Sequence, residues 1–306
     1  MELRAIGSLP VSIVGLGCNN FGMRIDYDAS ARVVGAALDA GITMFDTADI
    51  YGDTKSEEFL GRALGSRRSR AIIATKFGMR LDENRHGARP EYIRKAVEDS
   101  LRRLRTDYID LYQLHQPDPN VPIVDTLGAL DDLVKAGKVK QIGCSNFSAD
   151  QMDEAHRAAA PGAARFVSVQ NELSLLHREP EREVLPACTR LGLAFLPYFP
   201  LASGLLTGKY KRGRGAPEGS RLSLSRTARF TAPKNVAIAE ALANYASARG
   251  HTLLELAFSW LAAHGQLASV IAGATSPEQV RANAAAVDWR LRPEDLAEID
   301  RLAPPS

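Results

Sequence analysis

Short apolar runs recur along this chain at a nearly constant spacing, and this pattern restricts the possible folds more than any other feature. Eight runs carry the β-branched residues typical of strands, and each is followed by a segment with helical periodicity. Six of the seven intervals between their first residues measure 27 to 37 residues, about one strand–helix unit. The strands are predicted near residues 13–16, 43–46, 72–76, 109–115, 139–144, 166–170, 194–197 and 269–272.

Eight strand–helix repeats favour an α/β fold of the (β/α)8 or TIM-barrel type, with residues 1–306 as a single domain. An open sheet that binds a dinucleotide would carry a glycine fingerprint after its first strand. Here Gly15 and Gly17 are followed by Gly22, a spacing that does not match this fingerprint. The one long interval, 75 residues, contains a stretch rich in Gly, Ser, Arg and Pro between Leu201 and Ala232, which predicts a functional loop.

Helix starts are indicated by residues that suit the first turn of a helix. A serine side chain can accept a hydrogen bond from a free backbone N–H there, and proline is tolerated because that N–H has no partner within the helix. The predicted capping serines and first-turn prolines are Ser30, Ser56, Ser148, Ser276, Pro90, Pro277 and Pro293.

The overall charge and composition indicate a small-molecule ligand. Thirty-eight basic and 36 acidic residues leave a formal charge of +2, which gives no support to a nucleic-acid or membrane partner. The three cysteines have no spacing that suggests a disulfide framework or a metal site. The charged N-terminus and the absence of a long apolar run predict a mature, soluble, cytoplasmic protein, and the sequence makes no prediction of oligomeric state.

Three consecutive predicted strands end in a charged or ionisable residue, namely Asp46, Lys76 and His115. The two-residue alternation of a strand places all three on the inward side of a barrel, at the rim where barrel enzymes carry their chemistry. Tyr51 follows Asp46 by five residues, so its hydroxyl can reach the same rim.

Taken singly, such residues are more often turn, rim or structural groups. Together they suit proton transfer. A buried Lys76 needs a carboxylate such as Asp46, and a phenol beside a cationic lysine is a stronger acid, able to protonate a carbonyl oxygen. His115 is expected to orient that oxygen or relay the proton. The group contains no nucleophile, carboxylate pair or metal-ligand cluster, so no metal site is predicted and the electrons must come from elsewhere.

These residues lie within motifs that resemble the aldo-keto reductases along essentially the whole chain. The motifs are Gly15-Leu16-Gly17, Phe45-Asp46-Thr47-Ala48-Asp49-Ile50-Tyr51-Gly52, Thr75-Lys76, residues 107–115, Gly143-Cys144-Ser145-Asn146-Phe147 and residues 271–279. The resemblance implies an NADPH-dependent (NADP+-dependent in reverse) carbonyl reductase with Asp46, Tyr51, Lys76 and His115 as its tetrad. A non-enzymatic alternative is a redox-sensing regulatory subunit, like the potassium-channel beta subunits of the same family.

The later motifs predict where the cofactor lies. Polar strand ends suit the nicotinamide carboxamide, an aromatic ring suits stacking, and a loop with free N–H groups and a lysine suits the pyrophosphate. The N-terminus of a helix suits the adenosine ribose and its 2′-phosphate, and the resemblance adds an arginine of the long loop. In chain order these are Ser145, Asn146, Gln170, Tyr198, Pro200, Leu201, Ser203, Gly204, Leu205, Lys209, Arg221, Gly273, Thr275, Ser276, Gln279 and Asn283.

The best-known relatives carry a lysine and an arginine where this chain has Gly273 and Gln279, so a moderate preference for NADPH over NADH is expected. The branch that resembles the channel beta subunits shares this glycine and glutamine and still uses NADPH. Substrate contacts are predicted from Asn19, Asn20, Phe21 and Phe77, a mixed polar and aromatic surface that does not specify the substrate.

Overall fold

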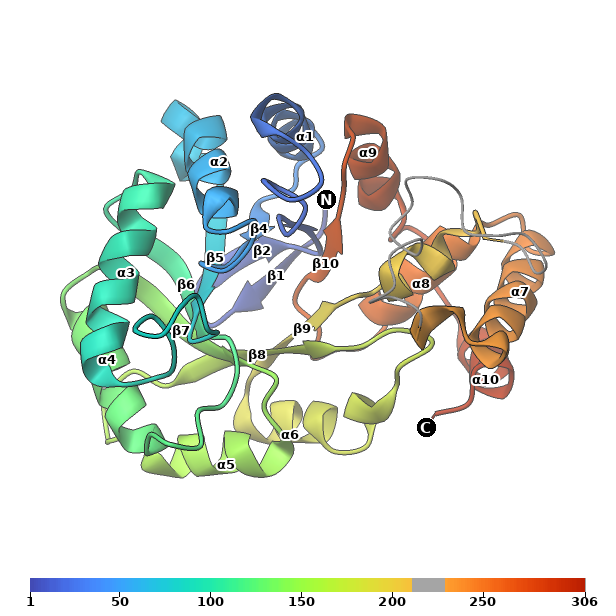
Figure 1. Cartoon of the computed structure of the whole chain (residues 1–306). Coiled ribbons are helices and arrows are strands. Elements are labelled where there is room, and N and C mark those ends of the chain that lie inside the picture. The colour runs from blue at the N-terminus through green and yellow to red at the C-terminus, as the bar shows by residue number, and fades with distance from the viewer. Residues whose placement is uncertain (211–228, 306) are drawn as a thin grey trace.

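The computed structural model describes residues 1–210 and 229–305. Eight parallel strands form a barrel with helices around its outside (Figure 1), which confirms the predicted fold. All eight predicted strands are present, and their ends differ from the predictions by at most two residues. They are β3 (Val14–Gly17), β4 (Met44–Asp46), β5 (Ile72–Phe77), β6 (Ile109–Leu114), β7 (Val139–Ser145), β8 (Phe166–Glu172), β9 (Ala194–Tyr198) and β10 (Val270–Gly273).

The strands follow one another around the barrel in chain order, and β10 returns to pair with β3. The edge between β9 and β10 is bridged just ahead of β10. There Phe195 N donates to Gln266 O (2.8 Å) and Ala268 N donates to Phe195 O (3.0 Å). Because all the carboxyl ends meet at one rim, the loops that follow the strands can build a single site.

A two-stranded hairpin that the sequence analysis did not predict precedes the barrel. Its strands are β1 (Leu3–Ile6) and β2 (Leu9–Ser12), which pair antiparallel. Ile6, Leu9 and Val11 join an apolar cluster with inward-facing barrel residues, including Met44, Ala74, Leu111, Leu196 and Ile271. The hairpin lies within the ring of strands in Figure 1, so it helps to fill the barrel away from the rim where the carboxyl ends of the strands meet.

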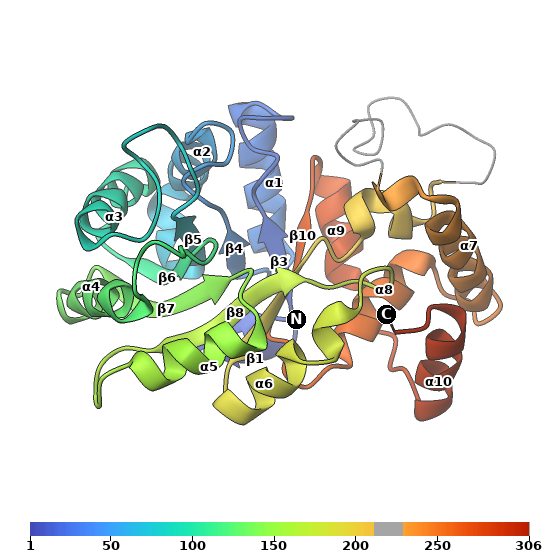
Figure 2. The same ribbon diagram turned by 60° about the horizontal axis from the view of Figure 1, so that its bottom comes forward.

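The helices bury their apolar faces against the outside of the barrel or against each other. Those around the barrel are α1 (Tyr27–Asp39), α2 (Lys55–Leu64), α3 (Pro90–Leu104), α4 (Ile123–Lys135), α5 (Ala149–Ala158), α6 (Val184–Leu191), α8 (Leu253–Ala262) and α9 (Pro277–Ala285). Two more, α7 (Pro233–Ser247) and α10 (Pro293–Leu302), lie side by side at one edge (Figures 1 and 2). No helix within the described ranges is long and apolar enough to cross a membrane.

Several predicted helix starts are confirmed. Ser148 caps α5, accepting a hydrogen bond from Gln151 N (3.2 Å), and Ser276 caps α9 in the same way through Gln279 N (3.4 Å). The three predicted prolines each occupy the first turn of a helix, at Pro90, Pro277 and Pro293.

The predicted caps Ser30 and Ser56 are wrong. Both serines lie inside helices, because α1 begins after Asp26 and α2 begins after Thr54. The Ser30 hydroxyl donates back to Asp26 O (2.7 Å), and the Ser56 hydroxyl donates to Cys18 O (2.9 Å). Both hydroxyls therefore satisfy other backbone groups instead of the free N–H groups of a first turn.

Candidate active site

A cavity of about 720 Å³ opens at the carboxyl ends of the barrel strands. Asp46, Tyr51 and His115 line it, and Lys76 lies beneath them against Asp46. The structure thus brings the four predicted tetrad residues together. Most of the other predicted site residues also line the cavity, namely Asn19, Asn20, Ser145, Asn146, Gln170, Tyr198, Pro200, Leu201, Ser203, Gly204, Lys209, Gly273, Thr275, Gln279 and Asn283.

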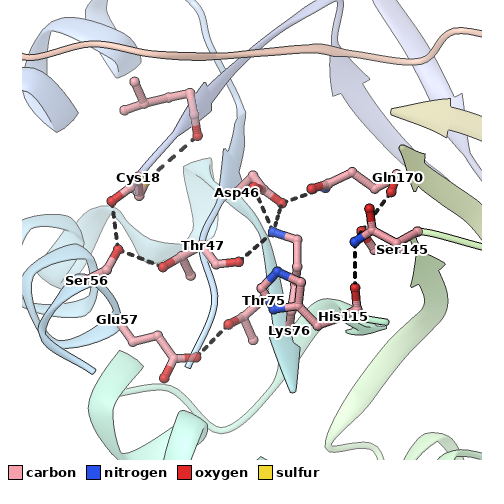
Figure 3. A network of polar contacts seen from close by, with 12 residues as sticks. Cys18, Asp46, Thr47, Ser56, Glu57, Thr75, Lys76, His115, Ser145 and Gln170 are labelled. Carbon is pink, nitrogen blue, oxygen red and sulfur yellow. Dashed lines mark hydrogen bonds and ion pairs between the residues drawn. The ribbon is translucent and has the colours of Figure 1, made fainter. Parts of the chain in front are cut away.

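A buried ion pair forms the floor of this cavity (Figure 3). Lys76 is 0% exposed and Asp46 is 3% exposed. Lys76 Nζ donates to Asp46 Oδ1 (2.7 Å) and Oδ2 (2.8 Å), and also to Thr47 O (2.9 Å). Gln170 Nε2 donates to Asp46 Oδ1 (2.8 Å), so β8 on the far side of the barrel also helps to hold the carboxylate.

The lysine remains a cation in this environment. Burial alone would lower the pKa of Lys76, because it disfavours the charged form, but the Asp46 carboxylate and the Tyr51 phenol raise that pKa above its ordinary value. Lys76 Nζ lies 5.2 Å from the centre of the Tyr51 ring. A fixed positive charge therefore sits directly beneath the phenol.

The imidazole next to Tyr51 is neutral. The rings of His115 and Tyr51 meet edge to face, with centres 5.8 Å apart. Burial and the charge of Lys76 lower the pKa of His115 to about 3. Its Nδ1 atom is buried without a hydrogen-bond partner among the described residues. Because His115 lines the cavity, it places a neutral imidazole beside a bound molecule without adding a charge.

A polar network joins the ends of β7, β8 and β9 across the cavity from Tyr51. Ser145 Oγ donates to Gln170 O (2.7 Å), and Asn146 Nδ2 donates to His115 O (2.9 Å). Tyr198 Oη donates to Asn146 Oδ1 (2.8 Å), which fixes the tyrosine ring at the wall. Burial, followed by the Glu172 carboxylate, raises the pKa of Tyr198 to about 12, so this ring stays a neutral phenol suited to stacking.

The segment after β9 lines the next part of the cavity. Ser203 and Gly204 lie in the 3₁₀ segment η3 (Ala202–Thr207) with positive φ angles of 56° and 103°. Ser203 Oγ is buried and has no hydrogen-bond partner among the described residues, while Lys209 is exposed at the cavity wall. The exposed Lys209 cation here can bind a phosphate.

The start of α9 lines the far end of the cavity. Gln279 Oε1 accepts hydrogen bonds from Thr275 N (2.9 Å) and Thr275 Oγ1 (3.2 Å), so this glutamine folds back onto the helix entrance. Gly273 is exposed at the end of β10, where an added Cβ would lie 3.1 Å from Asn20 Nδ2. Asn283, one turn along the helix, is 7% exposed.

Two predicted substrate contacts are corrected by the structure. Phe21 and Phe77 are both 0% exposed and belong to the apolar core between the strands and the helices. Because Lys76 points into the barrel, the alternation of β5 turns Phe77 outward, where its ring stacks on Tyr112 with centres 4.7 Å apart. The interpretation of these phenylalanines as substrate walls is therefore wrong.

Two predicted cofactor residues do not line the cavity, and a third is not among the described residues. Leu205 is 2% exposed within the core and does not line the cavity. Ser276 caps α9 beside the cavity without lining it. Arg221 lies outside the described residues.

The cavity walls include residues that the sequence analysis missed. Gly17 ends β3, and Ile271 and Ala272 lie just before the end of β10 at Gly273, so their positions could have been found by the strand-end rule applied to apolar residues. Leu254 and Ala282 belong to α8 and α9, and no strand-end signal indicates them. Among the described residues, the additional lining residues are Gly17, Arg24, Met79, Phe199, Thr207, Leu254, Ile271, Ala272 and Ala282.

Comparison with known proteins identifies the family of this chain. A family model described as the aldo/keto reductase family matches residues 13–304. The chain belongs to this family. Among curated relatives of this aldo-keto reductase, a probable aldo-keto reductase 1 of Glycine max is 36% identical over 307 residues, covering 96% of this chain and 86% of the relative. The aldo-keto reductase YhdN of Bacillus subtilis (strain 168) is 36% identical over 317 residues, covering 99% and 93%.

Solved structures agree with this assignment. An aldo-keto reductase from Bacillus halodurans in its holo form is 33% identical with a TM-score of 0.84, covering 100% of this chain and 97% of that one. A glycerol dehydrogenase from Gluconobacter oxydans is 34% identical with a TM-score of 0.85, covering 99% and 96%. This aldo-keto reductase is therefore an oxidoreductase of a family that generally binds a nicotinamide cofactor and acts on small molecules.

Proposed function

We propose that this enzyme reduces an aldehyde or ketone to the alcohol, or catalyses the reverse reaction, with NADPH as the preferred cofactor. One observation carries the proposal. The buried Lys76–Asp46 ion pair holds a cation beneath Tyr51, whose ring meets the neutral His115 at the cavity floor. Bound NADPH would supply the hydride, so the protein has to supply a proton and a place for the carbonyl oxygen.

Tyr51 is proposed as the proton donor. When its hydroxyl protonates the carbonyl oxygen, a phenolate remains, and the Lys76 ammonium stabilises this negative charge. Asp46 keeps Lys76 charged and fixes its position through two short hydrogen bonds. His115 stays neutral, so it can hold the carbonyl oxygen by a hydrogen bond without competing as the acid.

The cavity also fits a dinucleotide. Three residues that line it each carry a buried polar atom without a hydrogen-bond partner among the described residues: Asn20 Oδ1, His115 Nδ1 and Ser203 Oγ. Such atoms are costly unless a ligand or water satisfies them. Ser145, Asn146 and Gln170 would hold the nicotinamide carboxamide, and Tyr198 would cover one face of the ring, leaving the other for the substrate. The groups from Leu201 to Lys209 would hold the pyrophosphate.

The preference for NADPH rests on the N-terminus of α9, with Thr275 and Gln279 at its entrance. Free N–H groups at a helix N-terminus attract a phosphate. Gln279 and Gly273 add no positive charge, so the proposed preference is moderate and NADH remains usable. Arg221, outside the described residues, is proposed as a further phosphate contact.

The test is NADPH oxidation with a panel of aldehydes and ketones, with the corresponding alcohols and NADP+ in the reverse direction. The panel includes glycerol, because one structural neighbour is a glycerol dehydrogenase. The proposal expects turnover that depends on both cofactor and carbonyl compound. NADPH binding without turnover of any panel member would contradict it and favour the alternative of a redox-sensing regulatory subunit.

A further inference from the structure

A buried carboxyl group that the proposed chemistry does not use lies between two tetrad residues. Asp49 is 1% exposed in the loop that runs from Asp46 to Tyr51. No hydrogen bond of good geometry reaches either of its carboxyl oxygens from the described residues. Its backbone N–H donates to Lys76 O (3.1 Å), so Asp49 ties this loop to the strand that carries the lysine. An ionised carboxylate would be poorly solvated in such a place.

The surroundings of Asp49 already hold one carboxylate. Glu57 of α2 is 0% exposed, and its two oxygens accept hydrogen bonds from Thr75 Oγ1 (2.5 Å) and Arg103 Nε (2.6 Å). Arg103 of α3 thus balances the charge of Glu57. A second carboxylate at Asp49 would share this one guanidinium and repel Glu57. Ionising two neighbouring carboxyl groups in a buried site costs free energy, because the like charges repel each other.

The other ionisable groups around Asp49 do not reverse this balance. Lys76 of β5 is engaged with Asp46 on the barrel side. Burial raises the pKa of Tyr92 of α3 and of Tyr112 of β6, so both phenols stay neutral. Burial, followed by the Glu57 carboxylate, raises the pKa of Asp49 to about 8, against smaller opposing effects of Arg103, the Ile50 backbone N–H and Lys76.

We propose that Asp49 is a positioning residue for Tyr51. The carboxyl group of Asp49 has to stay protonated for the loop of residues 46–52 to pack against Lys76. Loss of this proton at alkaline pH places a second buried charge beside Glu57. The loop can relieve that charge only by moving so that the carboxylate reaches water. Since Tyr51 N donates to Ala48 O (3.2 Å) within the same loop, such a movement displaces the phenol. The role of Tyr51 in this inference rests on the proposed function.

The first test measures stability against pH and needs no turnover. In the unfolded chain Asp49 ionises with its ordinary pKa, whereas in the folded protein it keeps its proton until about pH 8. The native state therefore binds more protons between these values, and Asp49 makes stability fall as pH rises through that range. Asp49→Asn copies the neutral acid and abolishes this loss, so the melting temperature of the variant minus that of the wild type should increase from about pH 5 to about pH 8.

Asp53→Asn is the matched control, because Asp53 lies in the adjoining turn and is exposed. Its difference from the wild type should not change with pH. A difference for Asp49→Asn that is equally independent of pH would show that Asp49 is already ionised at neutral pH. That result would overturn the inference whatever the enzyme reduces.

The second test compares the pH profiles of kcat/KM. Asp49→Asn should match the wild type near neutral pH and retain more activity above about pH 8, where the wild-type carboxyl loses its proton. Coincident profiles through the alkaline range would refute the positioning role. So would a large loss of kcat/KM for Asp49→Asn at neutral pH, because the ionised form would then be the one that supports catalysis. If no carbonyl compound is turned over, the proposed function fails, while the stability test still decides the state of Asp49.

Discussion

Removing one partner of the buried Lys76–Asp46 pair should destabilise the whole barrel. In Asp46→Asn the Lys76 ammonium stays buried, at 0% exposure, without its counter-charge. Breaking a buried ion pair in this way costs about 3–5 kcal/mol. For a domain of 150–250 residues, each kcal/mol lost lowers the melting temperature by roughly 2–4 °C. The expected drop in melting temperature is therefore about 6–20 °C, toward the lower end for this longer chain.

A double variant separates the cost of an unpaired charge from the loss of packing. Asp46→Asn combined with Lys76→Met removes both charges of this pair, so it should recover much of the melting temperature that Asp46→Asn loses. The control is Asp132→Asn at the exposed Arg94–Asp132 pair, whose side chains are 53% and 60% exposed. Its cost should stay below about 1 kcal/mol. Calorimetry at neutral pH measures all three variants, and an Asp46→Asn protein as stable as the Asp132→Asn control would refute the reasoning.

Two further substitutions test the cofactor site and the barrel packing. Gln279→Arg gives up the hydrogen bond from Thr275 N but adds a cation near the proposed 2′-phosphate. The ratio of kcat/KM with NADPH to that with NADH should therefore rise roughly tenfold to a hundredfold, as a charge-assisted contact of about 1.5–3 kcal/mol implies. An unchanged ratio would remove position 279 from the site. Gly143→Ala should lower the free energy of unfolding by about 1–3 kcal/mol, because the added Cβ would lie 2.5 Å from Ser168 Oγ. The control is Gly128→Ala in α4, whose added Cβ meets nothing within 4 Å. Equal melting temperatures for the two variants would contradict this prediction.

The barrel could be predicted from the sequence because its signal is repeated eight times. Each buried parallel strand is a short apolar run, and their spacing is set by the helix that must follow. The hairpin of Leu3–Ile6 and Leu9–Ser12 has no such repetition, and its strands are only four residues long. The capping errors at Ser30 and Ser56 also arise because the local pattern is ambiguous. A serine hydroxyl near a helix start can accept a hydrogen bond from a backbone N–H or donate one to a backbone carbonyl.

The clustering of Asp46, Tyr51, Lys76 and His115 could be predicted because three of these residues lie at the ends of neighbouring strands and the two-residue alternation indicates their direction. The same alternation, applied one residue further, would have turned Phe77 away from the substrate. Contacts that cross between distant elements could not be predicted from local patterns. Leu254 and Ala282 reach the cavity from helices, and the burial of Asp49 beside Glu57 depends on how α2 and α3 pack behind the loop.

The central claim is that Tyr51 delivers the proton to the carbonyl oxygen above the Lys76–Asp46 pair. The most direct measurement is kcat/KM for NADPH-dependent reduction by Tyr51→Phe, made together with the Kd for NADPH by fluorescence titration. The account predicts a loss of roughly 10²-fold to 10⁴-fold in kcat/KM, the contribution of a positioned acid, with cofactor binding retained. A variant that binds NADPH and still reduces carbonyl compounds at close to the wild-type rate would contradict it, because the proton would then have to come from His115 or from water.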